Sequence, residues 1–89
     1  MSITEDLADK LAARVVAHIE RTGDEEVVAL LSQILGDSSQ TLRDAFVTSL
    51  LVQRTALRAD RMLAARMDQF AANEARDRDA IRPAGPEGG

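Results

Sequence analysis

His18 is the single histidine of this 89-residue sequence, which contains no cysteine, tyrosine or tryptophan. General acid–base chemistry would therefore fall to His18 or to a carboxylate, and no paired arrangement of such groups is visible. Since His18 lies at the edge of an apolar helical stripe, its position is typical of a partly buried, hydrogen-bonded histidine. We expect no catalytic residues and no enzymatic activity.

The sequence also contains no arrangement of residues that is typical of a metal or cofactor site. His18 and Glu20 are two residues apart, so on a helix they point to different sides. The acidic run Asp24 to Glu26 lacks the further oxygen ligands of a calcium loop. No glycine-rich phosphate-binding loop is present either. We expect neither a metal nor a cofactor.

The most concentrated positive charge lies between residues 54 and 66. Arg54, Arg58 and Arg61 stand at helical spacing and share one face, with Arg66 following. This face is suited to phosphates or to an acidic protein surface. Alternatively, these arginines flank an association surface and keep it soluble. No aromatic side chains accompany them, so single-stranded nucleic acid is not expected.

The elements that must position these residues are all helical. The hydrophobic fraction of 45% consists mainly of Ala, Leu, Val, Ile and Met, which favours helix over strand. A capping-box spacing at Ser2 to Glu5 and a stop at Gly23 predict a first helix over about 3–21. Its apolar residues recur mainly every four positions: Ile3, Leu7, Leu11, Val15 and Ile19, with Ala8, Ala12 and Val16 beside them.

A second helix is predicted over about 25–35, forming a short hairpin with the first. The segment Thr22 to Glu25 repeats the capping-box spacing, and Gly36 is expected to end the helix. Apolar residues cover more than half of its circumference: Val27, Val28, Leu30, Leu31, Ile34 and Leu35. We therefore expect this helix to be the most buried element.

A third helix is predicted over about 39–80, because neither glycine nor proline occurs between Gly36 and Pro83. Its apolar residues fall near a 3.5-residue repeat, interrupted by Ser49, Gln53 and Asp60, which favours a helical bundle over a straight two-stranded coil. The fold class is thus all-α, with residues 1–81 as one helical domain and 82–89 as a disordered tail.

The hairpin is too short to cover the third helix. At a rise of about 1.5 Å per residue, that helix is roughly 60 Å long and the first is roughly 27 Å. Apolar side chains of the uncovered half predict an interface, and a second copy is the simplest partner, with another protein as the alternative. The predicted interface residues are Leu57, Leu63, Ala64, Met67 and Phe70.

The segment Leu31 to Phe46 resembles the helix-turn-helix of bacterial transcription regulators. Ser32, Gly36 and Leu42 fit the small, turn-glycine and apolar positions of that motif, whereas Asp37 departs from it. The resemblance implies DNA contacts from residues at the start of the third helix, namely Ser38, Ser39, Gln40 and Arg43.

Charge and composition bear on the choice between these functions. Residues 1–37 hold eight acidic and three basic residues, and the whole chain carries −4, where a DNA-binding domain is usually basic. The N-terminus lacks a signal-peptide pattern and no apolar run reaches membrane-spanning length. We expect a cytoplasmic interaction module (adaptor, chaperone or structural subunit) that forms a dimer or larger oligomer and binds no membrane. The alternative is a small DNA-binding regulator.

Overall fold

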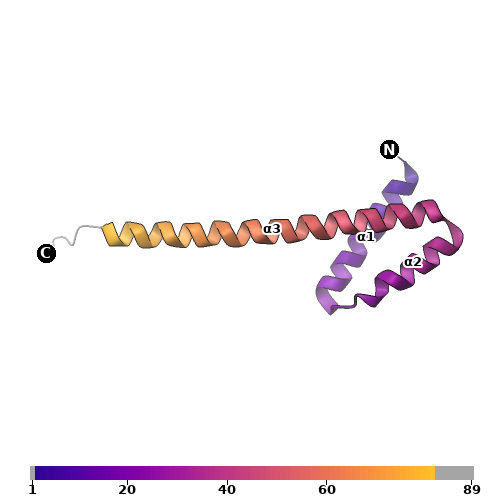
Figure 1. Ribbon diagram of the computed structural model, residues 1–89, viewed down its shortest axis with the longest axis horizontal. Helices are drawn as coiled ribbons and strands as arrows, with labels where there is room; N and C mark the ends of the chain where they lie inside the picture. Colours follow the sequence, from indigo (N-terminus) through magenta and orange to yellow (C-terminus); the bar gives the residue numbers. More distant parts are fainter. Residues whose placement is uncertain (1, 82–89) are drawn as a thin grey trace. The chain divides into compact units, whose positions relative to one another are not determined.

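The computed structural model describes residues 2–81, with side chains described up to residue 78. Three helices make up this part of the chain: α1 (Ile3–Thr22), α2 (Glu26–Ser38) and α3 (Gln40–Ile81) (Figure 1). The described residues contain no strand, so the predicted all-α class is confirmed. None of these helices holds a segment that is both long and apolar enough to cross a membrane. The predicted tail, 82–89, lies outside the described residues.

Helix α1 begins and ends as its sequence predicts. The Ser2 hydroxyl accepts a hydrogen bond from the Glu5 backbone N–H at 3.1 Å, which satisfies one of the free donors of the first turn. Gly23 follows the helix in the left-handed region, at φ 75°, and its N–H donates to the Ile19 carbonyl at 2.7 Å. Glycine suits this position because a Cβ disfavours positive φ.

The start of α2 differs from the prediction. Thr22 is the last residue of α1, and its hydroxyl donates to the His18 carbonyl and accepts from the Asp24 N–H. Glu25 precedes α2 in a helical backbone conformation and makes no side-chain cap. The predicted capping box from Thr22 to Glu25 is therefore wrong, because the Thr22 hydroxyl is already hydrogen-bonded within the turn that follows α1.

The predicted end of α2 at residue 35 is also wrong. Gly36 is helical, and α2 continues to Ser38, so that Ser39 alone separates it from α3. A Cβ at Gly36 would come within 3.1 Å of the Arg43 Cδ, so this glycine makes room for the arginine stem. Ser39 begins α3, since its hydroxyl accepts from the Leu42 N–H at 3.1 Å.

The core lies within residues 1–57 and is built by α1 and the first part of α3. Its buried side chains are Ala8, Ala12, Val15, Ile19, Phe46 and Leu50. Helix α2 contributes only partly buried residues, so the expectation that it is the most buried element is wrong. The apolar face of α1 is also rotated relative to the prediction, because Ile3 and Leu7 are exposed while Ala8 and Ala12 are buried.

The chain separates into two compact units, the first ending at Leu57 and the second beginning at Arg58. The boundary falls inside α3, whose helical backbone continues without interruption from Gln40 to Ile81. Within the first unit, Gln53 donates to the Asp9 carbonyl at 3.1 Å and Arg54 forms a bidentate pair with Glu25. These contacts tie α3 to α1 and to the start of α2.

Candidate interaction surfaces

Three large apolar side chains on the second part of α3 share one face and are exposed. Leu63, Met67 and Phe70 stand at positions i, i+4 and i+7 and are 57%, 61% and 55% exposed. We call these three residues the C-terminal stripe. The Arg66 guanidinium lies over the Phe70 ring, 5.2 Å from its centroid, and covers part of that ring.

The other residues predicted for this interface differ in their burial. Ala64 is exposed beside the stripe, whereas Leu57 is half-buried at the end of the first unit. Met62 is 65% exposed and was not among the predicted interface residues, because it falls outside the 3.5-residue repeat. Between Arg58 and Arg78, Asn73 alone is half-buried and every other residue is exposed.

The arginines predicted to share a binding face have separate surroundings. Arg54 donates to both carboxylate oxygens of Glu25, at 2.9 and 2.7 Å. This pair joins α3 to the start of α2, so Arg54 has a structural role in the first unit. Arg58 and Arg61 are exposed on the second unit. Sequence reasoning missed the Arg54–Glu25 pair because 29 residues separate the partners and only the packing of α2 along α3 brings them together.

Gln40 and Arg43, the other predicted contact residues, both turn toward Asp44. The Gln40 side-chain amide donates to Asp44 Oδ1 at 3.3 Å, and an Arg43 terminal nitrogen donates to the same oxygen at 3.1 Å. Arg43 is half-buried, and its Nε is buried without a hydrogen-bond partner. Its side chain therefore lies along the first unit rather than extending from it.

The helix-turn-helix resemblance is matched in part. Leu42 packs against the core and Ser32 is half-buried, as the motif requires of those two positions. The turn differs, since Gly36 lies inside α2 and a single residue, Ser39, connects the helices. A motif turn of three to four residues is therefore absent from this segment.

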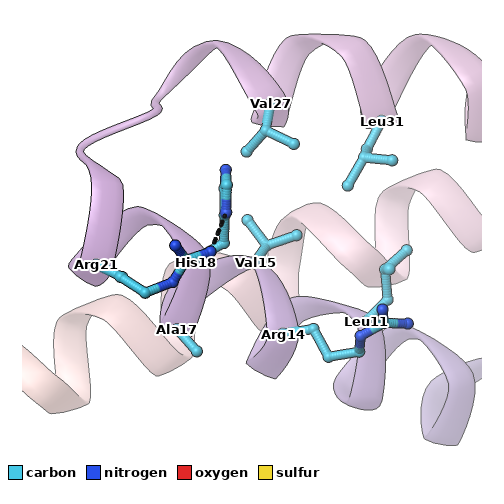
Figure 2. Close-up of a pocket in the computed structure, with 8 residues that line it drawn as sticks. All are labelled: Leu11, Arg14, Val15, Ala17, His18, Arg21, Val27 and Leu31. Carbon is cyan, nitrogen blue, oxygen red and sulfur yellow. Dashed lines mark hydrogen bonds between the residues drawn. The ribbon is translucent and has the colours of Figure 1, made fainter.

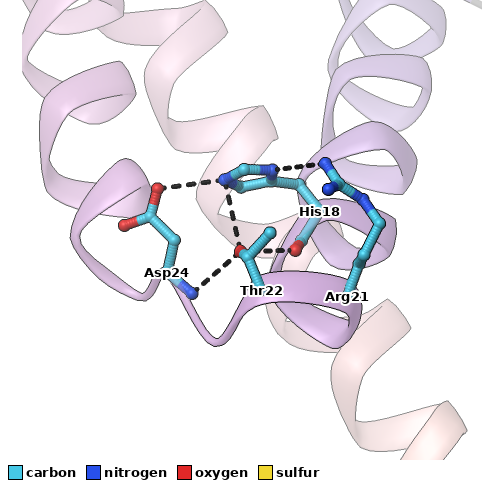
Figure 3. A network of polar contacts seen from close by, with 4 residues as sticks. All are labelled: His18, Arg21, Thr22 and Asp24. Atoms are coloured by element: carbon cyan, nitrogen blue, oxygen red, sulfur yellow. Dashed lines mark hydrogen bonds and ion pairs between the residues drawn. The ribbon is translucent and has the colours of Figure 1, made fainter.

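His18 belongs to a polar network that closes the α1–α2 turn (Figure 3). Its Nε2 lies 3.0 Å from an Asp24 carboxylate oxygen, and its Nδ1 lies 3.4 Å from an Arg21 terminal nitrogen. This geometry fits a ring that donates from Nε2 and accepts at Nδ1. Both ring nitrogens are engaged by neighbours in the chain, which is the structural role expected for this residue.

An apolar groove runs between α1 and α2 (Figure 2). Val27 and Leu31 of α2 face Leu11 and Val15 of α1 across it, and the groove is also lined by Arg14, Ala17, His18 and Arg21. A second depression adjoins it, because Leu11 and Arg14 line both, and it adds Leu7, Lys10 and Leu42. We call the two together the α1–α2 groove. Sequence periodicity alone does not reveal this groove, because its lining residues come from three helices.

The described residues thus present an exposed stripe on α3 and an apolar groove in the first unit. No three histidine or acidic side chains among them gather closely enough to hold a metal ion. Comparison with protein-family models, curated proteins and solved structures finds no significant match to this chain.

Proposed function

We propose that this protein is a non-enzymatic interaction module that self-associates through the C-terminal stripe. It would serve as an adaptor, a chaperone or a structural subunit, built around a dimer or larger helical bundle. One observation carries the proposal. Between Arg58 and Arg78 the helix exposes every residue except Asn73, including three large apolar side chains on one face.

A helix that exposes such a face needs a partner. Isolated helices are marginal in water, and most helical stability in proteins comes from packing an apolar face. Burying one Leu, Met or Phe side chain contributes roughly 1.5–3 kcal/mol, so three from each copy supply a sizeable driving force. A second copy provides the same stripe, and a two-fold axis brings both together without any other partner.

The charges beside the stripe favour an antiparallel pair. Asp60 and Glu74 lie on the same face as the stripe, three residues before Leu63 and four after Phe70. A parallel, in-register pair would place each carboxylate opposite its own copy, which is unfavourable. An antiparallel pair with Leu63 against Met67 of the second copy places Asp60 opposite Phe70 instead. We therefore propose the antiparallel arrangement.

Single cysteines test this orientation cleanly, because the chain has none of its own. In the antiparallel register, the two copies of a Phe70→Cys variant lie about 15 Å apart along the helices, too far for a disulfide. A mixture of Leu63→Cys and Met67→Cys is expected to form a mixed disulfide on mild oxidation. Efficient homodimeric disulfide formation by Phe70→Cys would instead show a parallel pair.

Paired charge substitutions test self-association itself. Leu63→Asp with Phe70→Asp places two carboxylates in the stripe and is expected to give a monomer by sedimentation velocity at all concentrations where the wild type associates. The matched control is Ala65→Asp with Ala72→Asp, which has the same spacing and charge on the opposite, exposed face. The proposal fails if both pairs have the same effect, or if the wild type is monomeric.

A DNA-binding regulator is the second candidate, supported by the packing of Ser32 and Leu42 described above. It has less support, since Arg54 pairs with Glu25, Gln40 and Arg43 contact Asp44, and the chain is acidic. The DNA-binding function predicts that the protein binds duplex DNA in a salt-sensitive way. The double substitution Gln40→Ala with Arg43→Ala should abolish this binding and leave the oligomer intact. Absence of duplex binding by the wild type at low salt would eliminate this candidate.

A further inference from the structure

The α1–α2 groove is a second, separate apolar surface, and both of its walls are helical. On α1, Leu7, Leu11, Arg14, His18 and Arg21 follow one another at helical spacing along one face. On α2, Val27 and Leu31 line the groove. Leu30 and Ile34 lie on the same α2 face by their i+3 and i+7 spacing from Val27, and are 55% and 63% exposed.

The groove carries positive charge in the most acidic part of the chain. Lys10, Arg14 and Arg21 are the only basic side chains before Arg43, and all three line the groove. Lys10 and Arg14 form no hydrogen bond or ion pair with any residue that the structure describes, and the contact recorded for Arg21 is with His18. The groove therefore combines an apolar lining with cations on the α1 side that form no ion pair with a described carboxylate.

The dimensions of the groove match a helix. From Leu7 to Arg21, the α1 wall spans 14 residue steps, about 21 Å at a rise of 1.5 Å per residue, or about four helical turns. A helix lying between two others places apolar residues at i, i+3, i+4 and i+7 into the groove. We propose that the α1–α2 groove binds an amphipathic helix of a partner protein, with acidic residues on the side of that helix that faces α1.

The cations argue against the exposed part of α3 from a second copy as the occupant. The exposed stretch from Arg58 to Arg78 has five arginines and four acidic residues, so it offers no net negative charge to Lys10 and Arg14. A separate acidic helix matches the groove in both apolar spacing and charge. This site is independent of the C-terminal stripe, so the failure of one proposal leaves the other standing.

A pair of synthetic peptides tests the proposal. The acidic peptide has about 18 residues, with leucines at the i, i+3, i+4 and i+7 positions and glutamates on the flanks. The basic peptide replaces every glutamate with lysine. In a titration followed by NMR of the isotope-labelled full chain, the acidic peptide is expected to bind about tenfold more tightly than the basic one. Its chemical-shift changes are expected at Leu7, Leu11, Arg14, Leu31 and Ile34.

Charge reversal supplies the controls. The double substitution Lys10→Glu with Arg14→Glu is expected to reverse the preference between the two peptides. Because both positions are exposed, the helix content should be retained. Arg58→Glu, an equal charge change at an exposed position outside the groove, is expected to change the acidic peptide's affinity less than twofold. Equal affinity for both peptides, or shift changes centred on residues 62–70, would overturn the proposal.

Discussion

Phe46 and Phe70 are the only aromatic residues of the chain, and both lie on α3. Phe46 is fully buried in the core of the first unit, whereas Phe70 is 55% exposed on the second unit. Both residues fall on the apolar repeat of about 3.5 residues along this helix, Phe46 at one of its two positions and Phe70 at the other. The comparison shows that the repeat identifies a face that needs covering, while neighbouring helices decide whether the chain covers it by itself.

The largest expected effect separates these two phenylalanines. Phe46→Ala leaves a cavity in a small core and is expected to reduce the free energy of unfolding of the first unit by about 3–5 kcal/mol. Phe70→Ala is expected to change it by less than about 0.5 kcal/mol, since that side chain is 55% exposed. Urea denaturation followed by far-UV circular dichroism measures both. Similar losses from both variants would contradict the comparison.

Gly23→Ala is expected to disturb the first unit alone. Its positive φ of 75° disfavours any Cβ, so the substitution is expected to destabilise the first unit by about 1–2 kcal/mol. The measurement is the thermal midpoint. At concentrations where the first unit is folded, the Gly23→Ala variant should have the same oligomeric mass as the wild type. A drop in that mass would show that self-association depends on the hairpin.

Gly36→Ala has a smaller effect that depends on Arg43. Alanine favours helix over glycine by about 1 kcal/mol, but the new Cβ would lie 3.1 Å from Arg43 Cδ. The gain in stability is expected to be larger in an Arg43→Ala background than in the wild type. A double-mutant cycle measures this coupling, and equal gains in both backgrounds would show that the arginine stem moves away freely.

The Glu25–Arg54 pair is expected to contribute least. Its atoms are partly exposed, so a double-mutant cycle with Glu25→Ala and Arg54→Ala should give a coupling energy of about 0.2–1 kcal/mol. The coupling should fall as salt is added, since exposed charges are screened. A coupling of several kcal/mol that persists in high salt would show that the pair holds α2 in place.

Local signals in the sequence were sufficient for part of this structure. The cap at Ser2, the stop at Gly23 and the long glycine-free stretch predict α1 and α3 to within about one residue at each end. Periodicity also identified Leu63, Met67 and Phe70 as one apolar face, and these residues are exposed. These features depend on residues close together in the chain, which sequence patterns report well.

Sequence patterns did not predict the features that depend on contacts between helices. Gly36 was predicted to end α2 because glycine commonly does so, yet its lack of a side chain admits Arg43 from the next helix. Helix α2 was expected to be the most buried element because apolar residues cover most of its circumference, yet only one side of it packs. The α1–α2 groove and the Glu25–Arg54 pair likewise depend on which faces the hairpin brings together.

Hydrogen exchange at two protein concentrations shows whether a second copy covers the C-terminal stripe. Amides of Ala8 to Ile19 should be protected equally in dilute and concentrated samples, because α1 packs within one chain. Amides of residues 62–74 should be poorly protected in the dilute sample and become protected as the chain associates. Protection of residues 62–74 that is the same at both concentrations, with a monomeric mass throughout, would contradict the claim that a second copy covers the stripe.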